Sequence, residues 1–155
     1  MKCLSVRSPL SYLIIEGGKD VENRTWNTDY RGKILIHSSG RDCDDIYDSF
    51  LTKPLLEEIY SFIKSKEIID FNSTSKEYQK LARLLKKSDE YIQKNKECYF
   101  KAGYIIGEVN LIDIIKDSKS KWAIKDNFHW ILDNPVLYEK PIKAKGKLGL
   151  FEVNI

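Results

Sequence analysis

The sequence has few residues of the kinds that bind metals or form covalent cross-links. It contains two histidines and three cysteines in 155 residues, and no two cysteines lie close together. Because neither a zinc pattern nor a CxxC pair is present, we expect no metal site and three reduced thiols, as in a cytoplasmic protein. The Walker and dinucleotide-binding glycine patterns are also missing, so we expect no cofactor.

Long apolar runs and a strong excess of one charge are missing as well. Apolar runs such as Tyr12 to Ile15 are far too short to cross a membrane, and the first residues carry no secretory signal. Lysine and arginine number 26 against 23 aspartates and glutamates, which gives a net charge of +3. This mildly basic balance is compatible with a polyanionic partner but does not require one.

Glycine is absent from residues 41–98, and this segment differs from its flanks. Apolar residues recur there at helical spacing, which predicts two helices at roughly 43–66 and 75–96. The flanks instead carry β-branched runs interrupted by glycine. Because strands from both flanks must pair with each other, we expect a single domain over residues 1–155 with a helical insertion at about 41–100.

The flanks predict several strands and one short helix. Ser8 is a good helix cap and proline suits the next position, so a helix is expected from Pro9 to Glu16. Gly17 and Gly18 would end it. Short apolar or alternating runs predict strands at 3–7, 32–37, 103–111, 128–132 and 148–153.

The polar stretch from Gly17 to Arg24 is the first candidate site. Lys19 is a mobile charge that suits a phosphate, and Arg24 offers a planar fork for a phosphate or a base edge. Glu22 could act as a general base or accept a hydrogen bond from a base edge. Alternatively, it forms an ion pair with a cationic side chain of the same loop. If the stretch is a strand, Glu22, Arg24 and Trp26 share one face. Trp26 would then stack on a base or close the core.

Further candidates carry two open interpretations each. His37 and Ser38 end a predicted strand and either contact a ligand or have structural roles. Trp122 and His129 either contact a base or take part in packing. A run of lysines near the end of the sequence is either a solvated loop or a track for phosphates: Lys140, Lys143, Lys145 and Lys147.

The spacing Gly-x-Lys-x-x-Glu-x-Arg, formed by Gly17, Lys19, Glu22 and Arg24, resembles the signature of the ASCH family. The segments LSVRSPLSYLIIEGGKDVENRTW, RGKILIHSSG, YIIGEVNLIDI and KGKLGLFEV are similar to that family's strands in the same order. The resemblance covers both β-rich flanks and thins across about 43–98. It implies an α+β, PUA-like fold, which is a small mixed β-barrel with helices packed around a cleft.

The resemblance also implies RNA binding, so we expect a module for RNA, most simply single-stranded, or for a nucleotide. The residues expected to contact this ligand are Gly17, Lys19, Glu22, Arg24, Trp26, His37, Ser38, Trp122 and His129. Some relatives hydrolyse RNA or a modified nucleoside, and in such an enzyme Lys19 and Glu22 would be catalytic. Amidohydrolase relatives carry a threonine soon after the lysine, whereas here the third residue is Glu22 and the nearest hydroxyl is Thr25. A protein-interaction adaptor built on the helical segment is the remaining alternative.

Overall fold

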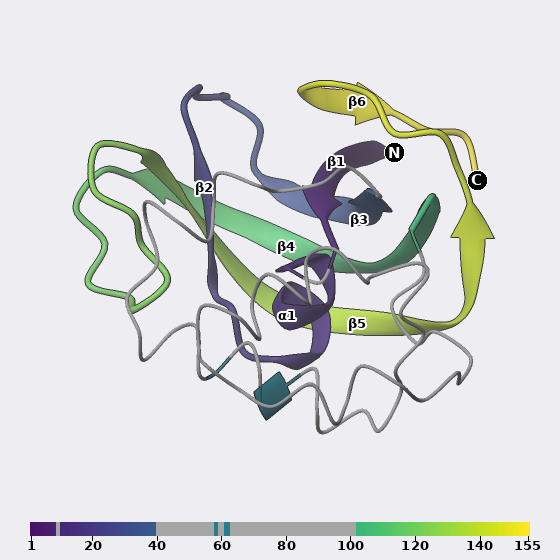
Figure 1. Ribbon diagram of the computed structural model, residues 1–155. Helices are drawn as coiled ribbons and strands as arrows, with labels where there is room; N and C mark the ends of the chain where they lie inside the picture. Colours follow the sequence, from purple (N-terminus) through teal and green to yellow (C-terminus); the bar gives the residue numbers. More distant parts are fainter. Residues whose placement is uncertain (9, 40–57, 59–60, 63–101) are drawn as a thin grey trace.

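In the computed structural model, which describes residues 1–8, 10–39, 58, 61–62 and 102–155, a six-stranded mixed sheet curls into a half-barrel around one short helix (Figure 1). The strand order is β2-β5-β4-β3-β1-β6. β1 and β3 are parallel, and the other neighbouring pairs are antiparallel. In chain order the elements are β1 (Lys2–Arg7), α1 (Leu10–Glu16), β2 (Val21–Arg24), β3 (Gly32–Ser39), β4 (Tyr104–Ile115), β5 (Phe128–Lys143) and β6 (Leu150–Glu152).

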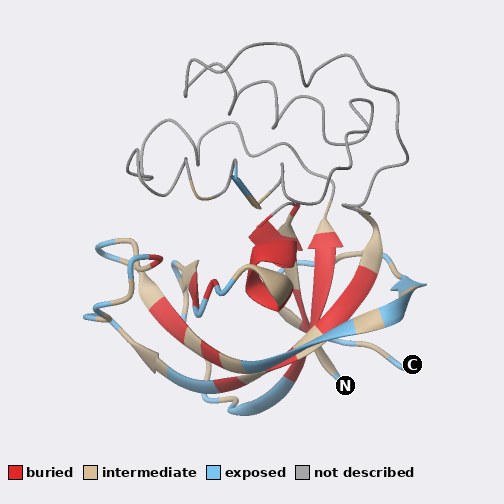
Figure 2. Cartoon of the chain, turned by 90° about the horizontal axis from the view of Figure 1, so that it is seen from below, coloured by how far each residue is buried: buried red, intermediate tan, exposed pale blue. Residues whose placement is uncertain are grey.

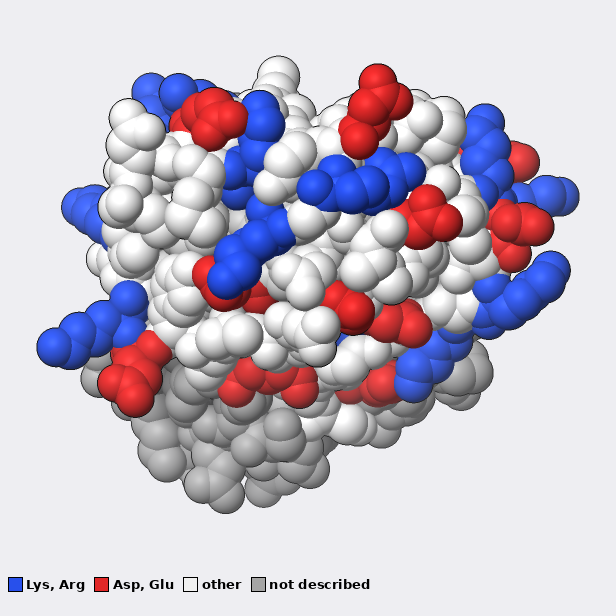
Figure 3. Space-filling view, turned by 180° about the vertical axis from the view of Figure 1, so that it is seen from behind, with Lys and Arg blue, Asp and Glu red and all other residues white. Residues whose placement is uncertain are grey.

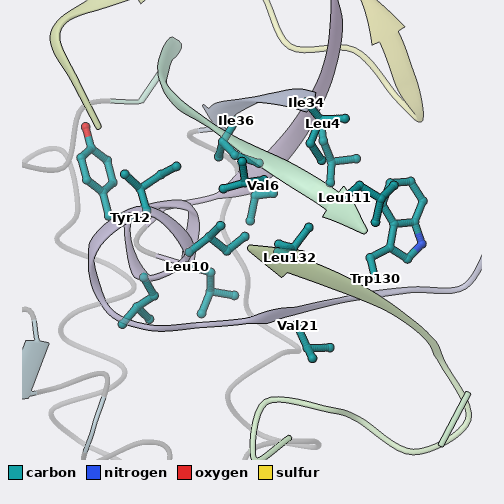
Figure 4. Close-up of a cluster of buried hydrophobic side chains, with 14 of the residues drawn as sticks. Leu4, Val6, Leu10, Tyr12, Val21, Ile34, Ile36, Leu111, Trp130 and Leu132 are labelled. Atoms are coloured by element: carbon teal, nitrogen blue, oxygen red, sulfur yellow. The ribbon is translucent and has the colours of Figure 1, made fainter. Parts of the chain in front are cut away.

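The main core fills the concave side of the sheet. Figure 2 shows α1 lying there with most of its residues buried. Alternate residues of a strand share one face, so Leu4 and Val6 of β1 point toward α1. Figure 4 shows them packed with Ile34 and Ile36 of β3 and with Trp130 of β5. The helix is apolar on nearly every side because the curled sheet surrounds it.

A smaller cluster lies on the opposite face of the sheet. Cys3, Leu35, Ile105 and Phe151 are buried there, on the alternate positions of their strands. Burial raises the pKa of the Cys3 thiol to about 12, so this side chain behaves as a small apolar group. The other two cysteines lie outside the described residues. Residues 144–149, which we call the crossover, connect β5 to β6 beside this cluster.

The strand β5 is much longer than predicted. The predicted strand ended at Leu132, but β5 continues to Lys143 and includes Pro135 and Pro141. A proline cannot donate to a sheet ladder and is therefore found at edges and bulges. β2 pairs only with the first part of β5, and the β4–β5 register shifts beside both prolines. The second half of β5 is thus an edge where these prolines fit.

The described part is mostly β rather than α+β, with one short helix beside an open half-barrel instead of several helices around a closed barrel. The predicted helical insertion lies outside the described residues, except that Glu58, Ser61 and Phe62 are helical. Among the described residues, no helix is long and apolar enough to span a membrane.

Candidate functional site

The candidate site begins where α1 ends. The backbone nitrogens of Gly17 and Lys19 both donate to the carbonyl of Leu13, at 2.9 and 3.0 Å. A Cβ placed on Gly17 would lie 2.5 Å from Leu13 Cδ2, and Gly18 has a left-handed φ of 72°. The glycine pair therefore turns the chain tightly at the end of the helix, as the structural interpretation predicted. Contact between Gly17 and a ligand stays a prediction.

Lys19, Glu22 and Arg24 form one buried ionic network. Lys19 Nζ donates to the carbonyl of Val21 at 2.5 Å and to Glu22 Oε2 at 2.6 Å. Glu22 Oε1 lies 3.1 Å from Arg24 Nη2. The side chains of Lys19, Glu22 and Arg24 are 4%, 11% and 23% exposed. A single carboxylate thus holds two cations, so the internal pairing considered for Glu22 is present.

The surroundings of Glu22 keep it ionised. Burial disfavours the charged carboxylate, and this effect alone would raise the pKa of Glu22. The adjacent charges of Lys19 and Arg24, and the hydrogen bond from Lys19, together outweigh burial and hold the pKa below its usual value of 4.5. The network therefore keeps an excess of one positive charge at neutral pH.

Arg24 connects two distant strands. Glu22 pairs with Trp130 in the β2–β5 ladder, so the side chains on that face of β2 point to the concave side. From there Arg24 Nη2 donates to the carbonyl of Ser5 in β1 at 2.6 Å. Arg24 Nε is also buried, and it has no hydrogen-bond partner in the part of the chain that the structure describes. This donor of Arg24 is therefore unsatisfied among the described residues.

Hydrogen bonds continue from Ser5 to the crossover through His37. His37 Nε2 donates to the carbonyl of Ala144 at 3.1 Å, so Nδ1 is the unprotonated nitrogen and accepts from the Ser5 hydroxyl at 3.1 Å. Burial lowers the pKa of His37 below its usual 6.5, which favours this neutral form. His37 is thus placed next to the residue that Arg24 binds, and its ring supports the crossover.

Trp26 lies beyond the end of β2 at Arg24, so strand parity does not place it, but it packs against the core on the concave side. Its ring meets that of Trp130 edge to face, with centroids 4.7 Å apart, and Trp26 is half-buried against the core. Trp130 Nε1 donates to the carbonyl of Trp26 at 3.4 Å. Closing the core is therefore one role of Trp26, and stacking on a base stays a prediction.

The remaining candidates make other contacts. Ser38 is fully buried and accepts a hydrogen bond from the Ser11 hydroxyl at 2.9 Å. Trp122 belongs to the main core. His129 accepts from the backbone nitrogen of Ser118 through Nδ1 and donates from Nε2 to the carbonyl of Ile124, which fixes the loop between β4 and β5. Ligand contacts at Ser38, Trp122 and His129 stay predictions.

Two contributors were missed from the sequence. The Ser5 carbonyl accepts a hydrogen bond from Arg24, and the Ser5 hydroxyl donates one to His37. Asn23 holds the β4–β5 loop by accepting from the backbone nitrogen of Ile124 at 2.8 Å and donating to the carbonyl of Trp122 at 2.8 Å. The parity of β2 places Asn23 on the face opposite Glu22, which was a usable signal. No local pattern marks Ser5, because its contact with Arg24 exists only once the sheet has curled.

Charge is mixed over the surface. On the face seen in Figure 3, basic and acidic side chains are interspersed, in line with the small net charge of +3. A binding site for a polyanion on such a molecule depends on particular local cations rather than on a uniformly basic face.

The fold and the site define a class of protein. A curled six-stranded half-barrel, with a short helix on its concave side and the Lys–Glu–Arg motif beside that helix, is the arrangement of a PUA-like module. A protein-family model described as ASCH domain matches residues 4–146. The chain therefore belongs to the ASCH domain family, whose members are generally linked to RNA binding.

Two relatives agree with this assignment. The chain is 26% identical over 162 residues to human Activating signal cointegrator 1 and 25% identical to the mouse protein of the same name. The matches cover 99% of this chain but 22% of each relative, so the chain spans about a fifth of their length. The family resemblance inferred from the motif is confirmed.

Proposed function

We propose that this chain is a binding module for single-stranded RNA or a nucleotide, with its anion site at Lys19, Glu22 and Arg24. The observation that supports this most is the buried, unpaired Arg24 Nε in a network with an excess of one positive charge. Burying an uncompensated charge is unfavourable, so an anion bound at Arg24 would stabilise the network. Guanidinium groups match the geometry of phosphate oxygens especially well.

The fold favours a single strand over a duplex. Reading duplex DNA normally requires a helix or a β-ribbon that enters the major groove. The helix α1 is buried on the concave side of the sheet and is not available for this purpose. Unpaired bases instead stack on aromatic side chains, and the half-buried Trp26 lies two residues from Arg24.

The test compares two arginine-to-lysine variants that keep the charge. Arg24→Lys removes the fork and Nε, whereas Arg31→Lys changes an exposed arginine whose side chain pairs with Asp113. Fluorescence anisotropy with a labelled six-nucleotide RNA should show salt-sensitive binding by the unchanged protein. Affinity should fall on the order of tenfold in Arg24→Lys and stay the same in Arg31→Lys. Absence of salt-sensitive binding, or equal affinity in both variants, would overturn the proposal.

The same samples test the hydrolase alternative. Lys19 Nζ and Glu22 Oε2 are 2.6 Å apart, which is an amine beside a carboxylate. RNA and N4-acetylcytidine incubated with the protein should be recovered unchanged by chromatography if the chain only binds. If product forms with the unchanged protein but not with Lys19→Met, the chain is an enzyme rather than only a binding module.

A further inference from the structure

The crossover has a fixed path over the sheet. In the strand order, β4, β3 and β1 lie between β5 and β6, so residues 144–149 must pass all three strands. Figure 1 shows this yellow segment running from the end of β5 to β6. The contacts follow the same order. Ala144 N donates to the carbonyl of Gly103, just before β4, at 3.0 Å, and the Ala144 carbonyl accepts from His37 of β3.

Gly146 brings the crossover close to the sheet. A Cβ at this position would lie 2.6 Å from His37 Cε1 and 2.8 Å from Ser5 Oγ, distances that real Cβ atoms do not adopt. Only glycine therefore fits against these two side chains without displacement. Ser5 is thus shared: its hydroxyl lies under Gly146 and bonds His37, while its carbonyl binds Arg24.

Two lysines flank this anchoring point. Ala144 and Gly146 lie against the sheet, whereas Lys145 and Lys147 are exposed. Neither lysine forms an ion pair with another described residue. β6 pairs only with Lys2–Leu4, so the crossover reaches β1 at the point where the Ser5 carbonyl and Arg24 meet. The crossover contacts Ser5 from the face of the sheet opposite to Arg24, so Ser5 connects the segment that carries the two lysines to the proposed anion site.

We propose that Lys145 and Lys147 form a second phosphate-binding element that extends the site around Arg24 along a single strand of RNA. This inference rests on the proposed function and adds to it the class of ligand. One phosphate at Arg24 would suffice for a mononucleotide, whereas two further cations on the crossover fit a ligand of several nucleotides. Backbone contacts of this kind strengthen binding without selecting a sequence.

The test separates the two elements by ligand length. The double variant Lys145→Ala with Lys147→Ala is compared with Lys119→Ala with Lys125→Ala, which removes the same charge from two exposed positions of the β4–β5 loop. Affinities for a nucleoside monophosphate and for six-nucleotide oligoadenylate and oligouridylate are measured over a range of salt concentrations. All four residues are exposed, so both variants are expected to fold.

The crossover variant should bind both six-nucleotide RNAs on the order of tenfold more weakly at low salt, with a salt dependence shallower by roughly 1.4 in the log–log slope. Its affinity for the monophosphate should be unchanged, and the loop variant should match the unchanged protein. Equal six-nucleotide affinities in the two variants, or a monophosphate affinity that falls as much as the six-nucleotide affinity, would overturn the inference. If the unchanged protein bound none of these ligands, the proposed function itself would fail.

Discussion

Arg24 Nη2 donates to the carbonyl of Ser5 at 2.6 Å and lies 3.1 Å from Glu22 Oε1. One nitrogen thus ties β2, at one end of the sheet, to β1, near the other end. The motif therefore holds the half-barrel in its curled shape, and the proposed anion site depends on the same cation. Because these two roles share one side chain, binding measurements on motif variants need a measurement of stability beside them.

The first prediction concerns the carboxylate that holds this network. Glu22→Gln should lower the free energy of unfolding by about 3 kcal/mol, because the buried Lys19 and the partly buried Arg24 would lose their counter-charge. Urea unfolding at neutral pH measures the difference. Glu139→Gln removes the same charge from an exposed position of β5 and should have no effect. Equal stability of the two variants would mean that the network contributes little to the fold.

The second prediction is a pH dependence at His37. Its pKa is lower in the folded chain than the usual 6.5, so the unfolded chain binds more protons and the stability from this residue is lost as pH falls below about 6.5. His37→Gln should therefore lose less stability than the unchanged protein between about pH 7 and pH 5. Urea midpoints at the two pH values check this. Parallel losses in both proteins would show that His37 is not the group that titrates.

Both flanks of the fold were predictable from the sequence because their signals are local. Runs such as Ile34-Leu35-Ile36 and Tyr104-Ile105-Ile106 are rich in β-branched residues and follow a nearby glycine, and each one lies in a strand. The shared face of Glu22 and Arg24 also followed from the two-residue period of a strand.

The features that were missed depend on contacts between distant segments. The strand that begins at Phe128 was predicted to end at Leu132, yet β5 continues through Pro135 and Pro141, which fit there because β2 does not reach that part of its edge. The contact between Arg24 and Ser5 depends on how far the sheet curls, which no local pattern encodes. The hydrogen bonds of His129 could not be predicted for the same reason. They hold the β4–β5 loop, whose position also depends on Asn23 of β2.

The third prediction concerns the β4–β5 loop, which Asn23 holds through two hydrogen bonds. Asn23→Ala removes the acceptor for Ile124 N and the donor to the Trp122 carbonyl, and it leaves both backbone groups without these partners. The free energy of unfolding should fall by about 2 kcal/mol. Amide hydrogen exchange should rise at Ile124 and remain unchanged in β3. Asn154→Ala, an exposed change near the last residue, should alter neither quantity. Unchanged exchange at Ile124 would contradict the assigned role of Asn23.

The fourth prediction compares two glycines of the crossover. Gly149→Ala places a Cβ in open space at a left-handed φ of 71°, so it should cost about 1 kcal/mol through backbone strain alone. Gly146→Ala instead drives a Cβ to 2.6 Å from His37 Cε1, so the crossover must move away from Ser5 and His37. This variant should be the less stable of the two in urea. Its histidine side-chain NMR signals should shift, because the bond from His37 Nε2 to Ala144 depends on the same close approach. If instead the two variants had equal stability and unchanged His37 signals, the crossover would not be anchored as Gly146 indicates.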